Sequence, residues 1–196
     1  MEDLLKRTSY LLLIEPEKKV SFRIEKLRDT IHSEVNMIEN PFYNPHVTVF
    51  EFLQYESFER KFVPAIRDFV SQLHPFTLTL TDFGSFGHTF YLQVKPLPKE
   101  LSKISACRKE LKVMTKATVN TQSIYHLTVF KDLAEQMSEK IWGNWKDKKF
   151  EDFFVVKEFV FLRKKDNQRH YQEVARFPLL GREIVKPVYV QGRLFD

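Results

Sequence analysis

The chain has 196 residues, of which 43% are hydrophobic and 29% are charged, and its net charge at pH 7 is +5. These values are typical of an ordinary soluble globular protein made of one domain or two small lobes. The longest purely apolar run, at 10–14, is too short for a transmembrane helix, and a lone Cys107 excludes an internal disulfide framework. The N-terminal segment lacks a signal-peptide pattern, so we expect a cytoplasmic protein without a membrane partner, and its mildly basic charge suits a polyanion such as nucleic acid.

The first half of the chain predicts alternating strands and helices. Apolar spacing and turn residues indicate a strand at 9–15, a helix at 21–35, a strand at 46–52, a helix at about 57–73 and a strand at 76–83. Pro64 falls inside the second helix, where it predicts either the true helix start or a kink.

The second half follows a similar order. It predicts a strand at 89–95, a helix at 99–114, a strand at 126–131, a helix at 133–145, a strand at 153–163 and a closing strand at 170–177. Asp132 and Glu135 have the spacing of a capping box for the 133–145 helix. The tail at 186–196 has no assignable role.

An internal repeat underlies this similarity. A shift of 80 residues lays "SYLLLIEP" over "TFYLQVKP", "IEKLRDTI" over "ISACRKEL" with Arg28 on Arg108, and "HVTVFEFL" over "HLTVFKDL". We therefore expect a single bilobal domain over 1–196, with repeats at about 9–83 and 89–163. The predicted fold class is α+β, with two largely antiparallel sheets flanked by helices. The repeats would be related by a pseudo-two-fold axis, and their equivalent strands would face each other across a central cleft.

Each repeat carries one histidine followed two residues later by a threonine. His46 and Thr48 point to one side of their strand because alternate side chains share a face, and His126 and Thr128 do the same. Two imidazoles near neutrality can supply one base and one acid, and threonine hydroxyls can hydrogen-bond phosphoryl oxygens. The pattern predicts a site for in-line displacement at phosphorus that needs no metal or other cofactor.

The motifs "HVTV" at 46–49 and "HLTV" at 126–129 resemble the hallmark of the 2H phosphoesterases, the 2′-5′ RNA ligase-like or cyclic phosphodiesterase superfamily. The resemblance covers most of the chain. It implies a bilobal α+β fold and hydrolysis of 2′,3′-cyclic phosphate or 2′-5′ phosphodiester linkages in RNA or nucleotides, with the two histidines as acid and base. Two alternatives stay open, namely 2′-5′ RNA ligation by the reverse reaction and a non-catalytic nucleotide- or RNA-binding module.

Further residues are weaker candidates. Lys131 is a candidate phosphate ligand, and Tyr43 and Tyr125 are candidate stacking platforms for a base, with ordinary packing as their alternative role. No histidine has metal-ligand spacing, so we expect no metal site. Cys107 falls on the apolar face of its helix and is expected in the core, and the protein is expected to be a monomer.

Overall fold

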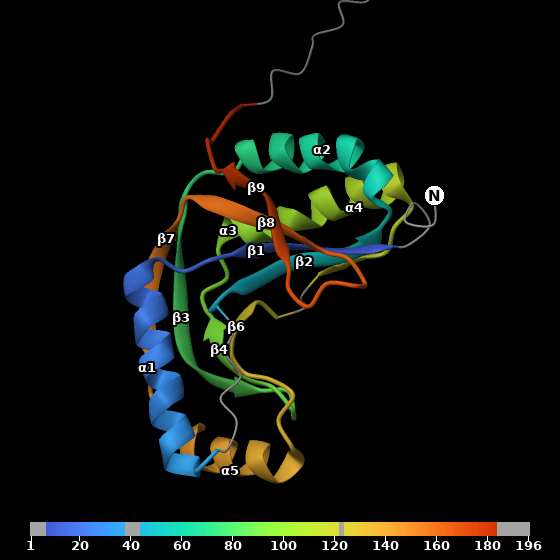
Figure 1. Cartoon of the computed structure of the whole chain (residues 1–196). Helices are drawn as coiled ribbons and strands as arrows, with labels where there is room; N and C mark the ends of the chain where they lie inside the picture. The colour runs from blue at the N-terminus through green and yellow to red at the C-terminus, as the bar shows by residue number, and fades with distance from the viewer. Residues whose placement is uncertain (1–6, 38–43, 122–123, 184–196) are drawn as a thin grey trace, which may run out of the picture.

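Helices and antiparallel strands alternate along the chain, and the computed structural model describes residues 7–37, 44–121 and 124–183 (Figure 1). The elements from the N-terminus are β1 (Thr8–Ile14), α1 (Lys18–Val35), β2 (Val47–Gln54), the 3-10 helix η2 (Glu56–Phe58), α2 (Glu59–Ser71), β3 (Phe76–Ser85), β4 (Phe90–Val94) and α3 (Lys99–Ser102). They continue with α4 (Ile104–Thr115), β5 (Val119–Thr121), β6 (His126–Phe130), α5 (Glu135–Trp145), β7 (Glu151–Val156), β8 (Glu158–Lys164) and β9 (Gln172–Pro178). Tyr43 and the tail at 186–196 lie outside the described residues.

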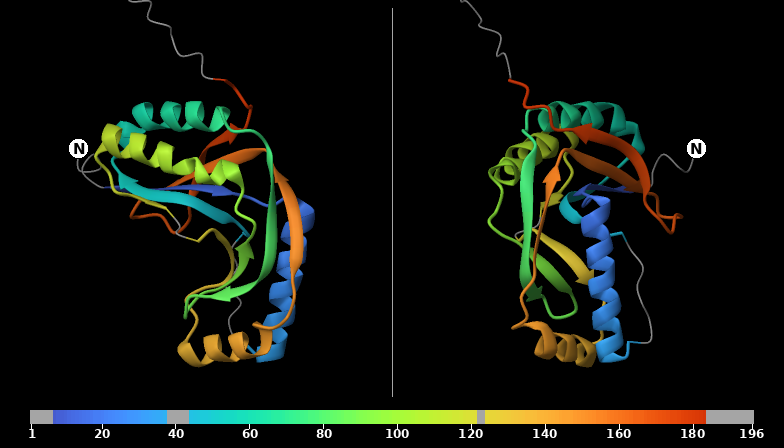
Figure 2. Two further views of the ribbon diagram at one scale, coloured as in Figure 1. Left: turned by 180° about the vertical axis from the view of Figure 1, so that it is seen from behind. Right: turned by 90° about the vertical axis from the view of Figure 1, so that its left-hand side faces the viewer.

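The strands form one nine-stranded sheet in the order β7-β3-β4-β6-β2-β1-β8-β9, with β5 paired to the far part of β2. The described strand pairs are antiparallel, so the α+β prediction is confirmed. The two halves of the sheet are joined edge to edge by β2 and β6, through the pair Val47–Leu127. The sheet curls strongly about this junction, and the helices lie on its outer side (Figure 2).

The motif strands do not face each other across a cleft as the sequence suggested, because they are neighbours in this one sheet. A two-fold axis between the repeats would run through the sheet at their junction. The strand order is symmetric about that junction, and α1 packs on α5 while α2 packs on α4 at the opposite end of the molecule (Figure 1). Each helix pair thus combines the first helix of one predicted repeat with the second helix of the other. This arrangement is compatible with the duplication, which itself stays a prediction.

The main hydrophobic core fills the space between the sheet and the helices. Its aromatic centre stacks Tyr10 on Phe52 and Phe161, with ring centroids 5.2 and 5.7 Å apart, and sets Phe62 edge-on to Tyr10 at 4.9 Å. Fully burying a large apolar side chain contributes roughly 1.5–3 kcal/mol, so this cluster holds α2 firmly on the sheet. Cys107 is buried in the same core, as predicted.

A smaller apolar cluster lies on the other face of the sheet. Leu11, Leu13 and Val160 are buried there, with Leu162 and Tyr171 packed against them. The helices of the described ranges leave this face open, and it is concave because the sheet curls around it (Figure 2); we call it the concave face.

Two local predictions are wrong. The strand expected at 153–163 is two strands separated at Lys157, because β7 pairs with β3 and β8 pairs with β1 at opposite ends of the sheet. The N-cap of α5 is Ala134 without a side-chain hydrogen bond, so Asp132, in the left-handed region at φ 57°, does not cap it. Pro64 lies inside α2 and does not start it, so of the two roles predicted for this proline only the kink stays a prediction. No helix within the described ranges is long and apolar enough to cross a membrane.

Candidate active site

The two histidine motifs meet at the junction of the two half-sheets. Val47 and Leu127, the residues that follow the histidines, are paired directly and are fully buried in the main core. Continuing an antiparallel register from this pair places His46 opposite Thr128 and Thr48 opposite His126. Opposite residues share a face, and both threonines and both histidines are only partly buried. All four motif side chains therefore gather on the concave face, with diagonal neighbours on the order of 8 Å apart.

Both imidazoles are held by the same hydrogen bond. His46 Nδ1 lies 2.8 Å from the carbonyl oxygen of Asn44, and His126 Nδ1 lies 2.8 Å from that of Ile124. A carbonyl only accepts, so each Nδ1 carries the proton and donates it. The nitrogen of each ring that is left for substrate is therefore Nε2. Neutral, it is an acceptor that can take a proton; charged, it is a donor that can deliver one.

The surroundings favour the neutral form of both rings. Burial lowers the pKa of His46 below its usual value, the hydrogen bond to Asn44 works against this, and the charges of Lys131 and Arg28 lower the pKa further. Burial also lowers the pKa of His126, again opposed by the hydrogen bond to its carbonyl partner. Near neutral pH the protein without substrate thus holds two uncharged imidazoles.

Arg28 holds the second motif in place, although it comes from the first half of the chain. It lies on α1 and is only 5% exposed. Its guanidinium donates from Nε to the carbonyl of Val129 and from Nη2 to that of Thr128, both at 3.0 Å. Arg28 continues the buried helical stripe of Ile24 and Ile31, and a charge at such a core position is the signal that could have identified it from sequence.

An aromatic wall flanks His126. The ring of Tyr91 lies 4.9 Å from the imidazole and that of Phe86 lies 5.2 Å from it, and the two aromatic rings stack on each other at 4.3 Å. Gly84 makes this possible, because a Cβ at that position would collide with the Tyr91 ring. Burial raises the pKa of the Tyr91 hydroxyl, which favours its neutral form. These residues carry no sequence motif, and they reach the histidine only through the β3–β4 hairpin and the pairing of β4 with β6.

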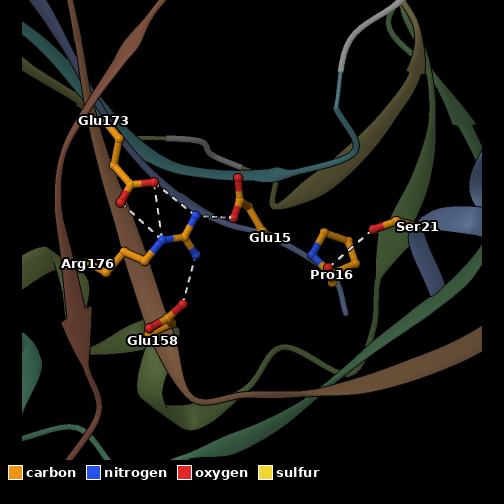
Figure 3. Close-up of polar contacts among 6 residues, drawn as sticks. All are labelled: Glu15, Pro16, Ser21, Glu158, Glu173 and Arg176. Atoms are coloured by element: carbon orange, nitrogen blue, oxygen red, sulfur yellow. Dashed lines mark hydrogen bonds and ion pairs between the residues drawn. The ribbon is translucent and has the colours of Figure 1, made fainter. Parts of the chain in front are cut away.

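A charged cluster fixes the segment beside His46. Glu15 directly follows β1, whose last residue Ile14 pairs with Val47. Arg176 on β9 donates to Glu15 at 2.9 Å, to Glu158 at 2.8 Å and to Glu173 at 2.9 Å (Figure 3).

Farther along the same segment, Ser21 donates to the carbonyl of Pro16 at 3.2 Å, which anchors the start of α1 (Figure 3). Glu15 acts on His46 through its charge, which raises the pKa of the imidazole and partly offsets the nearby cations.

Of the weaker site candidates, Lys131 is exposed to solvent and Tyr125 is partly buried. Lys131 is exposed just beyond β6, and its charge reaches His46. Tyr125 is partly buried and packs against the main core, so its packing role is the one its position supports. Among the described residues there is no group of three or more His, Cys, Asp or Glu side chains that could hold a metal ion. The motif side chains on the concave face thus offer two hydroxyls and two imidazoles, a set that can donate and accept protons.

Comparison with known proteins agrees with this arrangement. A sequence profile described as the 2′-5′ RNA ligase superfamily matches residues 16–168, a span that includes both motifs and most of the chain. The chain belongs to this superfamily, the 2H phosphoesterases. No curated protein matches the chain significantly.

Solved structures share the superfamily fold with this chain at low sequence identity. Escherichia coli LigT complexed with NADP+ has a TM-score of 0.67 and 17% identity over 89% of this chain and 99% of LigT. A structure described as a phosphoesterase has a TM-score of 0.64 and 17% identity over 89% of this chain and 98% of its own. The PDE domain of MHV ns2 has a TM-score of 0.53 and 12% identity over 80% of this chain and 99% of that domain. The predicted family and the predicted α+β fold class are thereby confirmed.

Proposed function

We propose that this protein hydrolyses 2′,3′-cyclic phosphate or 2′-5′ phosphodiester linkages of RNA or nucleotides by two-histidine acid–base catalysis without a metal ion. One observation carries the proposal: the two His-x-Thr motifs are paired side by side, and each imidazole is held through Nδ1 so that Nε2 is left for substrate. Membership of the superfamily supports it. E. coli LigT has been crystallised with phosphate and with 3′-AMP, which supports a nucleotide as partner.

The proposed chemistry uses the two Nε2 atoms, since each Nδ1 is bonded to a backbone carbonyl. One neutral imidazole accepts a proton from water as its oxygen bonds to phosphorus. The other imidazole, protonated, donates its Nε2 proton to the ribose oxygen as the P–O bond breaks. Since both histidines have the same tautomer and the same kind of hydrogen-bond partner, either can fill either role. A substrate phosphate is anionic, and its charge favours protonation of one of the two rings on binding.

The remaining groups act on the phosphoryl oxygens. Thr48 and Thr128 can donate their hydroxyl protons to the non-bridging oxygens, whose charge increases in the transition state. Arg28 holds the backbone carbonyls of the second motif, so it keeps the Thr128 side chain in place without touching substrate. Lys131, close enough to act on His46 by charge, is proposed to attract the phosphate.

The deciding experiment is hydrolysis of the four nucleoside 2′,3′-cyclic monophosphates in EDTA, with products identified by phosphorus NMR. We expect a single product isomer from the wild-type protein and none from His46→Ala. The isomer identifies which ribose oxygen leaves. Turnover that is abolished by EDTA, or that survives in His46→Ala, would contradict the mechanism.

Two outcomes favour the other activities. If a 2′,3′-cyclic end and a 5′-hydroxyl end are joined into a 2′-5′ linkage, the site runs the reverse reaction as a ligase. Saturable nucleotide binding with no product from cyclic, 2′-5′ linked or joined substrates would indicate a binding module instead. The monomeric state and the cytoplasmic location belong to the same proposal.

A further inference from the structure

A cavity lies at the end of β2 that is far from His46. It has a volume of about 630 Å³, which is in the range of ligand pockets. The cavity lies where β2 ends and where the chain between α4 and β5 runs past it. The residues used below are Arg7, Glu51, Leu53, Tyr55, Lys116 and Asn120, all of which line the cavity. We call it the β2-end pocket.

The strand pairing explains why the sheet opens here. The ladder between β2 and β5 reaches Phe52 and Val119 and stops. Gln54 then donates to the carbonyl of Thr115 at 2.7 Å, which ties the end of α4 to β2. Between these two attachments the residues after α4 are not paired with the strand, and the pocket occupies this part of the sheet edge.

The β2-end pocket is continuous with the catalytic face of β2. Thr48 pairs with Leu13, whereas farther along Glu51 pairs with Leu11 and Leu53 pairs with Ser9. Leu11 and Leu13 both belong to the small cluster on the concave face. Their partners Thr48 and Glu51 therefore point to that face as well. An extra residue in β2, at the bulge between these two pairs, is what allows both side chains to lie on the same side of the strand. A chain bound at His46 and Thr48 can follow β2 straight to Glu51 and Leu53, over roughly 20 Å of strand.

The groups at the pocket suit a nucleotide. The Arg7 guanidinium lies 5.9 Å from the centre of the Tyr55 ring, which pairs a cation with an aromatic surface. Lys116 adds a second exposed cation at the end of α4, and Asn120 adds an exposed amide. Cations can bind phosphate, a ring can stack on a base, and an amide can bond to a base edge. Glu51 is an acid among them, and it can accept from the exocyclic amine of cytosine.

The helix that leads to the pocket is also basic. Arg108, Lys109 and Lys112 lie exposed on α4, against one acid, Glu110. Lys116 continues this series past the helix end. A polyanion that reaches the pocket is therefore attracted by a wider surface as well.

We propose that the β2-end pocket binds a nucleotide of an RNA chain upstream of the phosphate that reacts at the histidines. The natural substrate is then an RNA end several nucleotides long, not a free cyclic mononucleotide. This inference rests on the proposed function for its link to catalysis. The binding of RNA by the pocket can be measured independently of turnover.

The test compares two substrates with the same terminal nucleoside: a cyclic mononucleotide and a hexanucleotide ending in a 2′,3′-cyclic phosphate. We expect wild type to favour the hexanucleotide in kcat/KM. Arg7→Ala combined with Lys116→Ala should lower kcat/KM for the hexanucleotide about tenfold and leave that for the mononucleotide unchanged. The salt dependence of hexanucleotide binding should become shallower by about 0.7 in log–log slope for each phosphate that the variant no longer neutralises.

Three further variants separate the effect of stacking from that of charge. Tyr55→Ala should weaken binding of the hexanucleotide about tenfold. Tyr55→Phe should retain that binding, because only the ring is needed. Lys146→Ala is the control, because it removes an exposed charge at the end of α5, on the far side of the molecule (Figure 1). It should change kcat/KM for neither substrate. Equal effects of the Arg7 and Lys116 changes on both substrates, or none on either, would overturn the proposal.

Binding of a fluorescent hexanucleotide, followed by anisotropy, distinguishes this proposal from the proposed function. If wild type turns over neither substrate but its binding is weakened by the Arg7 and Lys116 changes, the pocket proposal stands and the catalytic one fails. If both substrates are turned over but binding is the same in wild type and variant, the catalytic proposal stands and the pocket proposal fails.

Discussion

Val47 and Leu127 pair with each other across β2 and β6, and they are separated by the same 80 residues that relate the two halves of the sequence. An antiparallel pair made of equivalent residues is what a two-fold axis between repeats would require. The pairing sets the site because it places each histidine beside the threonine of the other motif. Neither motif forms the site alone.

Replacing either motif histidine should remove most of the activity. His46→Ala and His126→Ala should each lower kcat by about 10²–10⁴-fold, the usual contribution of one general acid or base. Hydrolysis of cyclic nucleotides with EDTA present measures this. His170→Ala is the matched control, because that histidine is exposed in the loop before β9 and should leave the rate unchanged. A reduced rate in all three variants would point to a general folding defect.

The threonine hydroxyls should matter for the reaction and little for the fold. Thr48→Val and Thr128→Val keep the shape of the side chain and should each reduce kcat/KM by about tenfold or more, since a donor to the phosphoryl group is removed. Thr48→Ser and Thr128→Ser retain the donor and should recover most of the activity. Valine variants as active as wild type would show that the hydroxyls do not contact substrate.

The pH dependence follows from the lowered pKa of both histidines. In the free protein both values lie below about 6.5, and the reaction needs one neutral and one protonated ring. The bell-shaped profile of kcat/KM reports free-enzyme values, so its maximum should lie below about pH 6.5. A maximum above about pH 7.5 would contradict the environment described for the two rings.

The same shifts act on stability. An unfolded histidine binds protons more readily than either ring in the native state, so unfolding takes up protons as the pH falls through the histidine range. The contribution of the two histidines to the free energy of unfolding is therefore fully present above about pH 6.5, and it declines as the pH falls through their lowered native pKa values. Urea denaturation at pH 7.5 and pH 5 should show a smaller decline for His46→Gln combined with His126→Gln than for wild type. An equal decline would place the acid sensitivity elsewhere.

Arg28 should be a structural requirement of the site. Arg28→Met leaves two carbonyls of β6 without their charged donor, and we expect a decrease of about 3 kcal/mol in the free energy of unfolding together with reduced activity. Urea denaturation and turnover measure the two effects. Arg108, the equivalent residue under the 80-residue shift, is exposed, and Arg108→Met should cost less than about 0.5 kcal/mol. Similar decreases in both variants would remove the special role of Arg28.

The aromatic wall beside His126 depends on the absence of a side chain at Gly84. Gly84→Ala should displace the Tyr91 ring and lower kcat, with a smaller effect on KM, because the imidazole loses its flanking support. Adding Tyr91→Leu to Gly84→Ala should relieve the collision and recover stability in thermal denaturation. If Gly84→Ala leaves both activity and stability unchanged, the close approach does not matter.

Much of the site can be predicted from sequence because strands impose a period of two. His46 and Thr48 must share a face opposite Val47, and the same holds for the second motif. The shift of 80 residues then made it plain that the two motifs occupy equivalent places. The strand–helix order and the buried Cys107 follow from local apolar spacing as well.

Long-range pairing decided what local patterns could not. One apolar run at 153–163 becomes two strands only because its halves find partners at opposite ends of the sheet. Tyr91 and Phe86 reach His126 through the β3–β4 hairpin and its pairing with β6. By itself the sequence determined which side chains are proposed to carry the chemistry, since that choice depends on residue type and strand period. Only the tertiary structure decided how they meet, because the contacts of Arg28 and the opening at the end of β2 depend on residues far apart in the chain.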